Sequence, residues 1–228
     1  MSAGGGADPS GRCVRRKALV FVISGPSGAG KSTFVARLLE RDPELRFSVS
    51  ATTREPRQTE HDGRDYHFLP AEEFQRRIDS EEFLEHALVH GARYGTLRSE
   101  VQRSLDAGRS VLLDVDVQGG IEIKRRMPEA VLVFLVPPTM QELERRLRFR
   151  KTESEEKIQA RLARAPAEIR CMDRYDYVVV NDQIEPTEAD LVAILHAERL
   201  RRERWTDDAG TPDVVGEYLR EAAKPSHP

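Results

Sequence analysis

Hydrophobic and polar residues follow one another along the chain in blocks that predict strands and helices in turn. Four short runs are continuously apolar and have the length of a strand: residues 18–23, 111–115, 131–136 and 177–180. A strand that is apolar on both faces is typical of a parallel sheet covered by helices on its two sides.

The segments between these runs have the apolar spacing of amphipathic helices. They are residues 31–40, 99–107, 139–150, 153–169 and 188–204. Thr139 with Glu142, and Thr152 with Glu155, have the spacing of capping boxes, and Gly108 suits a helix C-terminus. Repeated alternation of strand and helix predicts an α/β fold, in which helices flank a parallel sheet.

Residues 48–97 interrupt this alternation. Short β-type pieces at 47–51, 66–69 and 84–90 surround one helical stretch after Pro70, with turn residues between them. We interpret this segment as an inserted lobe of mostly antiparallel strands.

The predicted domain therefore spans residues 17–205, with its core formed by 17–47 and 98–205 and with the insert at 48–97. Residues 1–16 are small, polar and rich in glycine, so we expect a disordered N-terminal tail. Residues 206–228 form a C-terminal tail to which the sequence assigns no role.

Composition narrows the class of protein. The 228 residues include 36 Lys and Arg against 39 Asp and Glu, a net charge of −3, and 39% are hydrophobic. These values exclude a fibrous or wholly disordered chain, and no apolar run reaches the about 18–20 residues of a membrane span. Cys13 and Cys171 are far apart and form no CxxC pair. We expect a cytoplasmic enzyme.

A phosphate-binding loop is the clearest motif. Residues 25–32 read GPSGAGKS and match G-x-x-x-x-G-K-[ST] at every fixed position, with a strand before and a helix after. Glycines let backbone N–H groups converge on phosphate oxygens, and the following helix N-terminus favours anions. The predicted ATP-binding residues of this loop are Gly25, Pro26, Ser27, Gly28, Ala29, Gly30, Lys31, Ser32 and Thr33.

The same motif predicts a metal. In such loops the lysine, here Lys31, reaches the β- and γ-phosphates, and the hydroxyl of Ser32 binds Mg²⁺. Asp114 ends a predicted strand where phosphate-loop proteins place an acidic residue near that ion. ATP as a co-substrate and Mg²⁺ as a cofactor are the expected small molecules.

A GTPase is an open alternative at this point. Asp116 and Gly119 spell D-x-x-G, a fragment found in GTPase switches, but no Asn-Lys pair occurs anywhere to read guanine in the GTPase manner.

Five further segments, in order, resemble the guanylate kinase family. They are SVSATTREPR at 48–57, GRDYHF at 63–68, FLE at 83–85, YGT at 94–96 and DVDVQG at 114–119. The resemblance extends from about Ala18 to Arg204. It implies that ATP phosphorylates GMP, and also dGMP, to give GDP and ADP by direct in-line transfer without a protein nucleophile.

The resemblance also implies roles for residues of the insert. Those assigned to the GMP phosphate are Ser50, Arg54, Arg57, Tyr66 and Tyr94, and those assigned to the guanine are Glu85, Thr96 and Asp116. Arginine offers forked donors to phosphate, which agrees with the first set. Guanine presents N–H donors at N1 and N2 where adenine presents an acceptor at N1, so a carboxylate favours guanine.

An arginine-rich lid is expected at about residues 139–170. The resemblance places Arg146, Arg150 and Arg161 on the transferring phosphates, where with Lys31 and Arg54 they form the expected catalytic set. Ion pairing with nearby glutamates is the alternative for Arg145, Arg148 and Arg164. Phe149 and Lys151 flank Arg150, where the family often has glycine. This departure concerns the hinge geometry of the lid and not the roles of the arginines.

Asn181 follows the last apolar run, at a position that the resemblance places near the adenine of ATP. A turn residue at the end of a strand is the alternative for it.

Two other functions stay open on the sequence. One is a kinase with a different nucleotide acceptor. The other is a non-catalytic guanylate-kinase-like module that binds phosphopeptides, although such modules typically lose residues equivalent to Lys31, Ser32, Arg146 and Arg150. The expected partners are GMP and ATP, without nucleic acid or membrane, and a homo-oligomer is left open.

Overall fold

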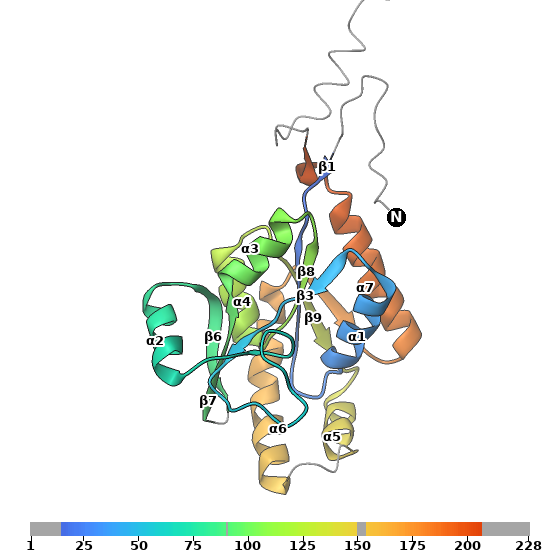
Figure 1. The fold of residues 1–228 in the computed structure, drawn as a ribbon. Coiled ribbons are helices and arrows are strands. Elements are labelled where there is room, and N and C mark those ends of the chain that lie inside the picture. The colour runs from blue at the N-terminus through green and yellow to red at the C-terminus, as the bar shows by residue number, and fades with distance from the viewer. Residues whose placement is uncertain (1–14, 90, 150–153, 207–228) are drawn as a thin grey trace, which may run out of the picture.

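The computed structural model describes residues 15–89, 91–149 and 154–206, and within them a five-stranded parallel sheet forms the core. Its order is β10-β9-β2-β8-β3, and every neighbouring pair is parallel (Figure 1). The strands are β2 (Val20–Ser24), β3 (Leu45–Phe47), β8 (Ser110–Asp114), β9 (Val131–Val136) and β10 (Tyr177–Val180). The predicted α/β fold with a parallel sheet is confirmed.

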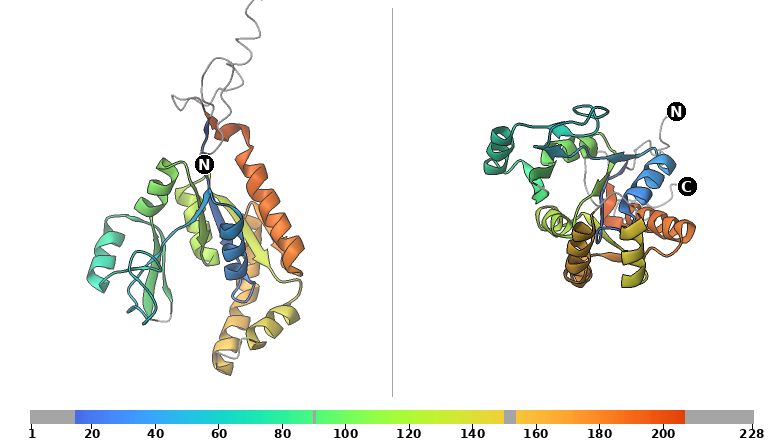
Figure 2. Two further views of the ribbon diagram at one scale, coloured as in Figure 1. Left: turned by 45° about the vertical axis from the view of Figure 1, so that its right-hand side comes forward. Right: turned by 90° about the horizontal axis from the view of Figure 1, so that it is seen from below.

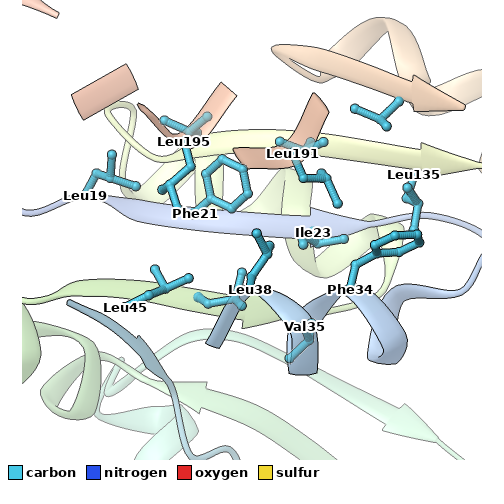
Figure 3. Close-up of a cluster of buried hydrophobic side chains, with 14 of the residues drawn as sticks. Leu19, Phe21, Ile23, Phe34, Val35, Leu38, Leu45, Leu135, Leu191 and Leu195 are labelled. Carbon is cyan, nitrogen blue, oxygen red and sulfur yellow. The ribbon is translucent and has the colours of Figure 1, made fainter. Parts of the chain in front are cut away.

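Helices cover both faces of this sheet, which explains why its central strands are apolar throughout. Phe21 and Ile23 of β2 pack against α1 (Lys31–Arg41) and α7 (Ile184–Arg199), as Figure 3 shows. Val20 and Val22 face the opposite side, toward α3 (Arg98–Asp106) and α4 (Val117–Arg126). Burial of each such side chain contributes about 1.5–3 kcal/mol to folding, so the sheet holds the phosphate loop on a rigid support.

The insert forms a second, smaller sheet of order β5-β4-β7-β6, beside the main one (Figure 2). Its elements are β4 (Ala51–Thr52), β5 (His67–Phe68), α2 (Ala71–Asp79), β6 (Phe83–Val89) and β7 (Ala92–Leu97). β7 pairs antiparallel with both β4 and β6, whereas β4 and β5 are parallel. Phe74 and Phe83 stack at the centre of its own small core.

Two lid helices, α5 (Met140–Phe149) and α6 (Glu155–Ile169), lie at the carboxyl ends of the strands (Figure 1). A 3₁₀ helix, η1 (Arg170–Arg174), continues α6. Leu143 and Leu147 of α5 pack against Ile158 and Ala165 of α6. The Thr139 hydroxyl accepts a hydrogen bond from the Glu142 N–H at 3.0 Å, as one half of the predicted capping box requires. Thr152 and the residues beside it lie outside the described part.

Several elements differ from the prediction, among them strand β7, which lies beyond the predicted β-type pieces of the insert. Helix α4 was not predicted, because Gly119 and Gly120 in its first turn argue against helix. A Cβ at Gly120 would lie 2.4 Å from the Tyr175 hydroxyl, so packing requires the glycine. Strand β3 was not predicted as a strand of the core, because the expected β-type piece at 47–51 overlaps it only at Phe47; Leu45–Phe47 pairs in parallel with β8 at the edge of the main sheet.

The last helix was also predicted four residues too short at its start. α7 begins at Ile184, because Pro186 lies in the first helical turn, where a missing N–H breaks no helical bond. It ends at Arg199, and the 3₁₀ helix η2 (Arg202–Arg204) follows where a continued helix was expected.

Strand pairing continues slightly beyond the predicted domain of residues 17–205. Arg15–Arg16 forms β1, which pairs antiparallel with β11 (Trp205–Thr206), so ordered structure extends beyond 17 and 205. This ribbon lies at the end of the molecule opposite the lid (Figure 1). The rest of the two predicted tails, residues 1–14 and 207–228, lies outside the described residues. Among the helices that are described, none has the length and apolarity needed to cross a membrane.

Candidate active site

The phosphate loop connects β2 to α1, and its backbone is crowded on two sides. Gly25 has a φ of 151°, and a Cβ there would lie 2.0 Å from the backbone oxygen of Leu135 in β9. Gly30 has a φ of 95°, and a Cβ there would lie 2.5 Å from Nδ2 of Asn181. Glycine is therefore required at both positions, and the loop leads directly into the N-terminus of α1, the end of a helix that favours anions.

Asn181 holds this loop in place. It is 6% exposed, and its Nδ2 donates to the Ala29 backbone oxygen at 2.7 Å. Its own backbone oxygen accepts from Nη2 of Arg146 at 2.9 Å. Asn181 thus connects the loop to the lid, and neither sequence reading of it, as an adenine contact or as a turn residue, anticipated this contact.

Lys31 and Asp114 interact electrostatically beside the loop. Nζ of Lys31 donates to the Gly25 backbone oxygen at 2.9 Å. Burial raises the pKa of the Asp114 carboxyl, and the charge of Lys31 opposes that rise. Because β2 and β8 are parallel neighbours, Asp114 comes to the carboxyl edge of the sheet beside the loop.

The oxygen donors available here suit Mg²⁺. Ser32 in the first turn of α1 and Asp114 at the end of β8 offer a hydroxyl and a carboxylate, which hard cations prefer. Over the described ranges, no group of three or more His, Cys, Asp or Glu side chains could hold a metal by itself. A magnesium ion at this place would depend on phosphate oxygens and water for its other ligands, as Mg²⁺ with nucleotides usually does.

Two of the three predicted lid arginines reach the loop region. Nη1 of Arg161 donates to the Ser27 hydroxyl. Arg146 contacts the Asn181 backbone and pairs with Glu142 through Nε at 2.6 Å. Arg150 lies outside the described residues.

Two other lid arginines form ion pairs with nearby glutamates at the surface, which was the alternative interpretation of the sequence for them. Arg145 pairs with Glu142 at 2.7 Å, and Arg148 pairs with Glu144 and Glu155 at 2.9 and 2.6 Å.

In the insert, Arg54 is the centre of a cluster of three predicted phosphate ligands. Its Nε donates to the Tyr94 hydroxyl at 3.3 Å, and its guanidinium carbon lies 5.5 Å from the centre of the Tyr66 ring. The rings of Tyr66 and Tyr94 are 6.0 Å apart. Burial raises the pKa of Tyr66, so its hydroxyl stays protonated and able to donate.

The predicted base-reading residues form a separate cluster. Glu85 is 8% exposed, and its Oε1 accepts from the hydroxyl of the fully buried Thr96 at 2.7 Å. A Cβ at Gly119 would lie 3.1 Å from Oε2 of Glu85 and 3.3 Å from Oδ1 of Asp116. Both carboxylates therefore lie beside Gly119 and close to one another. Burial, reinforced by the charge of Asp116, raises the pKa of Glu85 to about 7.

Asp116 differs from Glu85 in its surroundings. It is exposed and is the N-cap of α4, where its Oδ1 accepts from the Gly119 N–H at 2.7 Å. This cap accounts for the D-x-x-G spacing without a GTPase switch.

Known proteins match this chain over most of its length. A family model described as guanylate kinase matches residues 17–198. The guanylate kinase of Anaeromyxobacter dehalogenans is 50% identical over 214 residues, which are 92% of this chain and 93% of that relative. That of Fusobacterium nucleatum is 49% identical over 176 residues, 77% and 95% of the two chains. The chain belongs to the guanylate kinase family.

A solved structure agrees with this assignment. The crystal structure of guanylate kinase from Anaplasma phagocytophilum is 34% identical, with a TM-score of 0.70 over 94% of this chain and 100% of that one. The fold described above is therefore the guanylate kinase fold.

The structure brings together most of the side chains that the family resemblance singled out. Arg54, Tyr66 and Tyr94 share one cluster, and Glu85, Thr96 and Asp116 share another. Arg57 is linked to the first cluster through its backbone N–H, which donates to the Glu60 carboxylate that also pairs with Arg54. The carbonyl of Ser50 accepts from the His67 N–H at 2.9 Å, a contact that does not involve this cluster.

One residue of this site was not predicted. Glu60 accepts hydrogen bonds from both Arg54 and Arg57. Its signal in the sequence is a carboxylate three residues after Arg57, which by itself looks like any polar turn residue.

Proposed function

We propose that this guanylate kinase family member transfers the γ-phosphoryl group of ATP to GMP, and to dGMP, giving ADP with GDP or dGDP. The observation that carries the proposal is the contact between the phosphate loop and the base-reading cluster of Glu85, Thr96 and Asp116. Ser24, the residue before the phosphate loop, donates from its hydroxyl to the Asp116 backbone oxygen at 3.3 Å. The phosphate loop and the base-reading cluster therefore adjoin at one edge of the sheet.

The ATP half of the proposed site is the loop and its neighbours. The loop of residues 25–33, through the backbone N–H groups of its residues other than Pro26, and the side chain of Lys31 bind the phosphates of ATP, and the adenine lies toward Asn181. Ser32 and Asp114 would hold Mg²⁺, which would neutralise phosphate charge and help to orient the transferring group. The crowded glycines and the burial of Asp114 support this half.

The GMP half is the insert. Arg54, Arg57, Tyr66, Tyr94 and Ser50 hold the phosphate of GMP, and Glu85, with Thr96 and Asp116, accepts hydrogen bonds from the guanine. The hydroxyl of Thr96 already donates to Oε1 of Glu85, and Oε2, which lies toward Gly119, is the oxygen that we assign to the base. An adenine there would meet the carboxylate with a lone pair, which disfavours it.

The transfer requires positioning and charge stabilisation rather than acid–base chemistry. The attacking oxygen belongs to a phosphate that is already anionic, so no general base is needed. Lys31, Arg54, Arg146 and Arg161 supply positive charge around the transferring group, and the family resemblance adds Arg150. A lid that excludes water prevents ATP hydrolysis. The substrates are nucleotides of the cytoplasm, where we expect the enzyme to act.

GMP affinity is expected to increase with pH through the pKa of Glu85. Guanine needs the ionised carboxylate, and the free protein holds its proton until about pH 7. Between pH 6 and 8 the dissociation constant for GMP therefore falls about tenfold on this account, as linkage of one proton requires. Calorimetric titration across that range measures the change.

The phosphate of GMP also titrates near pH 6, so a control is needed. Glu85→Gln cannot ionise and loses the part of the pH dependence that belongs to Glu85. An unchanged profile in that variant would contradict the assignment.

For stability the sign is opposite. The unfolded state loses the Glu85 proton near the ordinary pKa of 4.5, while the folded protein keeps it to about 7. Without nucleotide, the contribution of Glu85 to stability is therefore greatest at low pH and is lost as the pH rises between these values.

The products test the proposed reaction. Chromatography of a mixture of ATP and GMP incubated with the protein is expected to show ADP and GDP in equal amounts. Release of inorganic phosphate in place of GDP would contradict phosphoryl transfer and identify a hydrolase.

A further inference from the structure

Glu60 lies in the turn between β4 and β5, and its carboxylate uses both oxygens within the proposed GMP phosphate site. Oε1 accepts from Nη2 of Arg54 at 2.9 Å. Oε2 accepts from the backbone N–H of Arg57 at 2.8 Å. The side chain is only 15% exposed, although it belongs to a turn.

The Arg54 guanidinium is held on every nitrogen. Nη1 donates to the Glu55 backbone oxygen at 2.7 Å, Nε donates to Tyr94 at 3.3 Å, and Nη2 donates to Glu60. The plane also lies against the rings of Tyr66 and Phe68, at 5.5 and 5.8 Å from their centres. Glu60 supplies the anionic contact in this set and thereby fixes the direction of the fork.

We propose that Glu60 is a positioning residue for the acceptor phosphate. Through one oxygen it orients the guanidinium of Arg54, and through the other it orders the backbone that carries Arg57. The inference rests on the proposed function, because it assigns both arginines to the phosphate of GMP. It adds a role for a residue that never touches the nucleotide.

An opposite effect of Glu60 is conceivable on charge alone. A carboxylate near a phosphate dianion repels it, and removal of that charge would strengthen GMP binding. Two observations favour the positioning role. Both oxygens are occupied by donors, and the hydrogen bond from Arg54 lowers the pKa of Glu60, so the carboxylate and guanidinium form a neutral pair at neutral pH. An ordered arginine also binds without losing rotamer freedom at that moment.

The variant Glu60→Gln tests the proposal, because it keeps the shape of the side chain and removes its charge. Calorimetric titration with GMP is expected to show a dissociation constant about tenfold higher than in the wild type. In steady-state assays the KM for GMP rises in parallel, while the KM for ATP stays within about twofold.

The matched control is Asp65→Asn in the same turn. Asp65 also accepts from a backbone N–H, that of His61 at 2.9 Å, and also pairs with an arginine, Arg64. Neither of these contacts involves Arg54 or Arg57. We expect its dissociation constant for GMP to be that of the wild type.

A double-mutant cycle shows whether Glu60 acts through Arg54. In an Arg54→Ala background, Glu60→Gln is expected to raise the GMP dissociation constant much less than it does alone, because part of what it positions is gone. Fully additive effects would overturn the proposal. So would unchanged or tighter GMP binding in Glu60→Gln, or a rise in the KM for ATP as large as that for GMP.

Failure of the proposed function gives a different result. A wild-type protein that binds no GMP overturns the function itself, whereas wild-type binding with an equal constant in Glu60→Gln overturns only the role of Glu60.

Discussion

Replacement of Lys31 by alanine is expected to lower kcat for GMP phosphorylation by at least about 10³-fold. Lys31 belongs to the crowded phosphate loop. Its ammonium group donates a hydrogen bond to the Gly25 backbone oxygen and interacts with the charge of Asp114. A cation at that place stabilises charge on the β- and γ-phosphates as the transferring group leaves. A loss of this size corresponds to about 4 kcal/mol of transition-state stabilisation.

The Lys31→Ala protein is expected to stay folded, because a single hydrogen bond contributes only about 0.5–1.5 kcal/mol net to stability. Thermal unfolding checks this. The matched control is Lys17→Ala. Lys17 is exposed and precedes β2, whereas Lys31 lies beyond the other end of that strand, and we expect the Lys17→Ala enzyme to have wild-type turnover. A Lys31→Ala enzyme that keeps a tenth of the wild-type kcat would contradict the assigned role.

The second large effect is expected for base selection. Glu85→Gln should reduce the preference for GMP over AMP, measured as the ratio of kcat/KM values, by at least about 10²-fold. The amide oxygen still accepts from Thr96, so the pocket keeps its shape. Its NH₂ group, however, meets a donor on guanine and an acceptor on adenine, which reverses the preference of the carboxylate.

Glu82→Gln is the control for this variant. Glu82 is an exposed carboxylate three residues before Glu85, and we expect it to leave the GMP-to-AMP ratio unchanged. If Glu85→Gln keeps the wild-type ratio, the buried carboxylate does not read the base.

The sequence predicted what depends on local pattern. The strands β9 and β10 agree with their apolar runs. β9 is buried on both faces, so its signal lies in every residue, whereas β10 is an edge strand in which Val178 and Val180 are exposed. The phosphate loop is local in the same sense, since its glycines, its lysine and the helix that follows are consecutive.

Contacts between distant segments could not be predicted in this way. Helix α4 has two glycines that oppose a helix locally, yet Gly120 is required because Tyr175, 55 positions later, packs against it. The buried state of Glu85 similarly depends on α4 lying beside its strand. The role of Glu60 depends on the fold of its turn, which returns a carboxylate to Arg54.

Family resemblance, not periodicity, indicated the insert residues as a group. It named Arg54, Tyr66, Tyr94 and Glu85, which the structure then collects into two clusters. It did not separate the lid arginines that reach the loop from those in surface ion pairs. Arg161 contacts Ser27 while Arg148 pairs with glutamates, a difference set by which face of each helix meets the loop.

The central claim is that one edge of the sheet combines an ATP site with a guanine-selective acceptor site. Initial rates of ADP formation in a coupled assay test it directly, with GMP, dGMP, AMP, UMP or no acceptor added to ATP. The account predicts rapid ADP formation with GMP and dGMP and little with AMP, UMP or no acceptor. A rate with AMP comparable to that with GMP would contradict the claim.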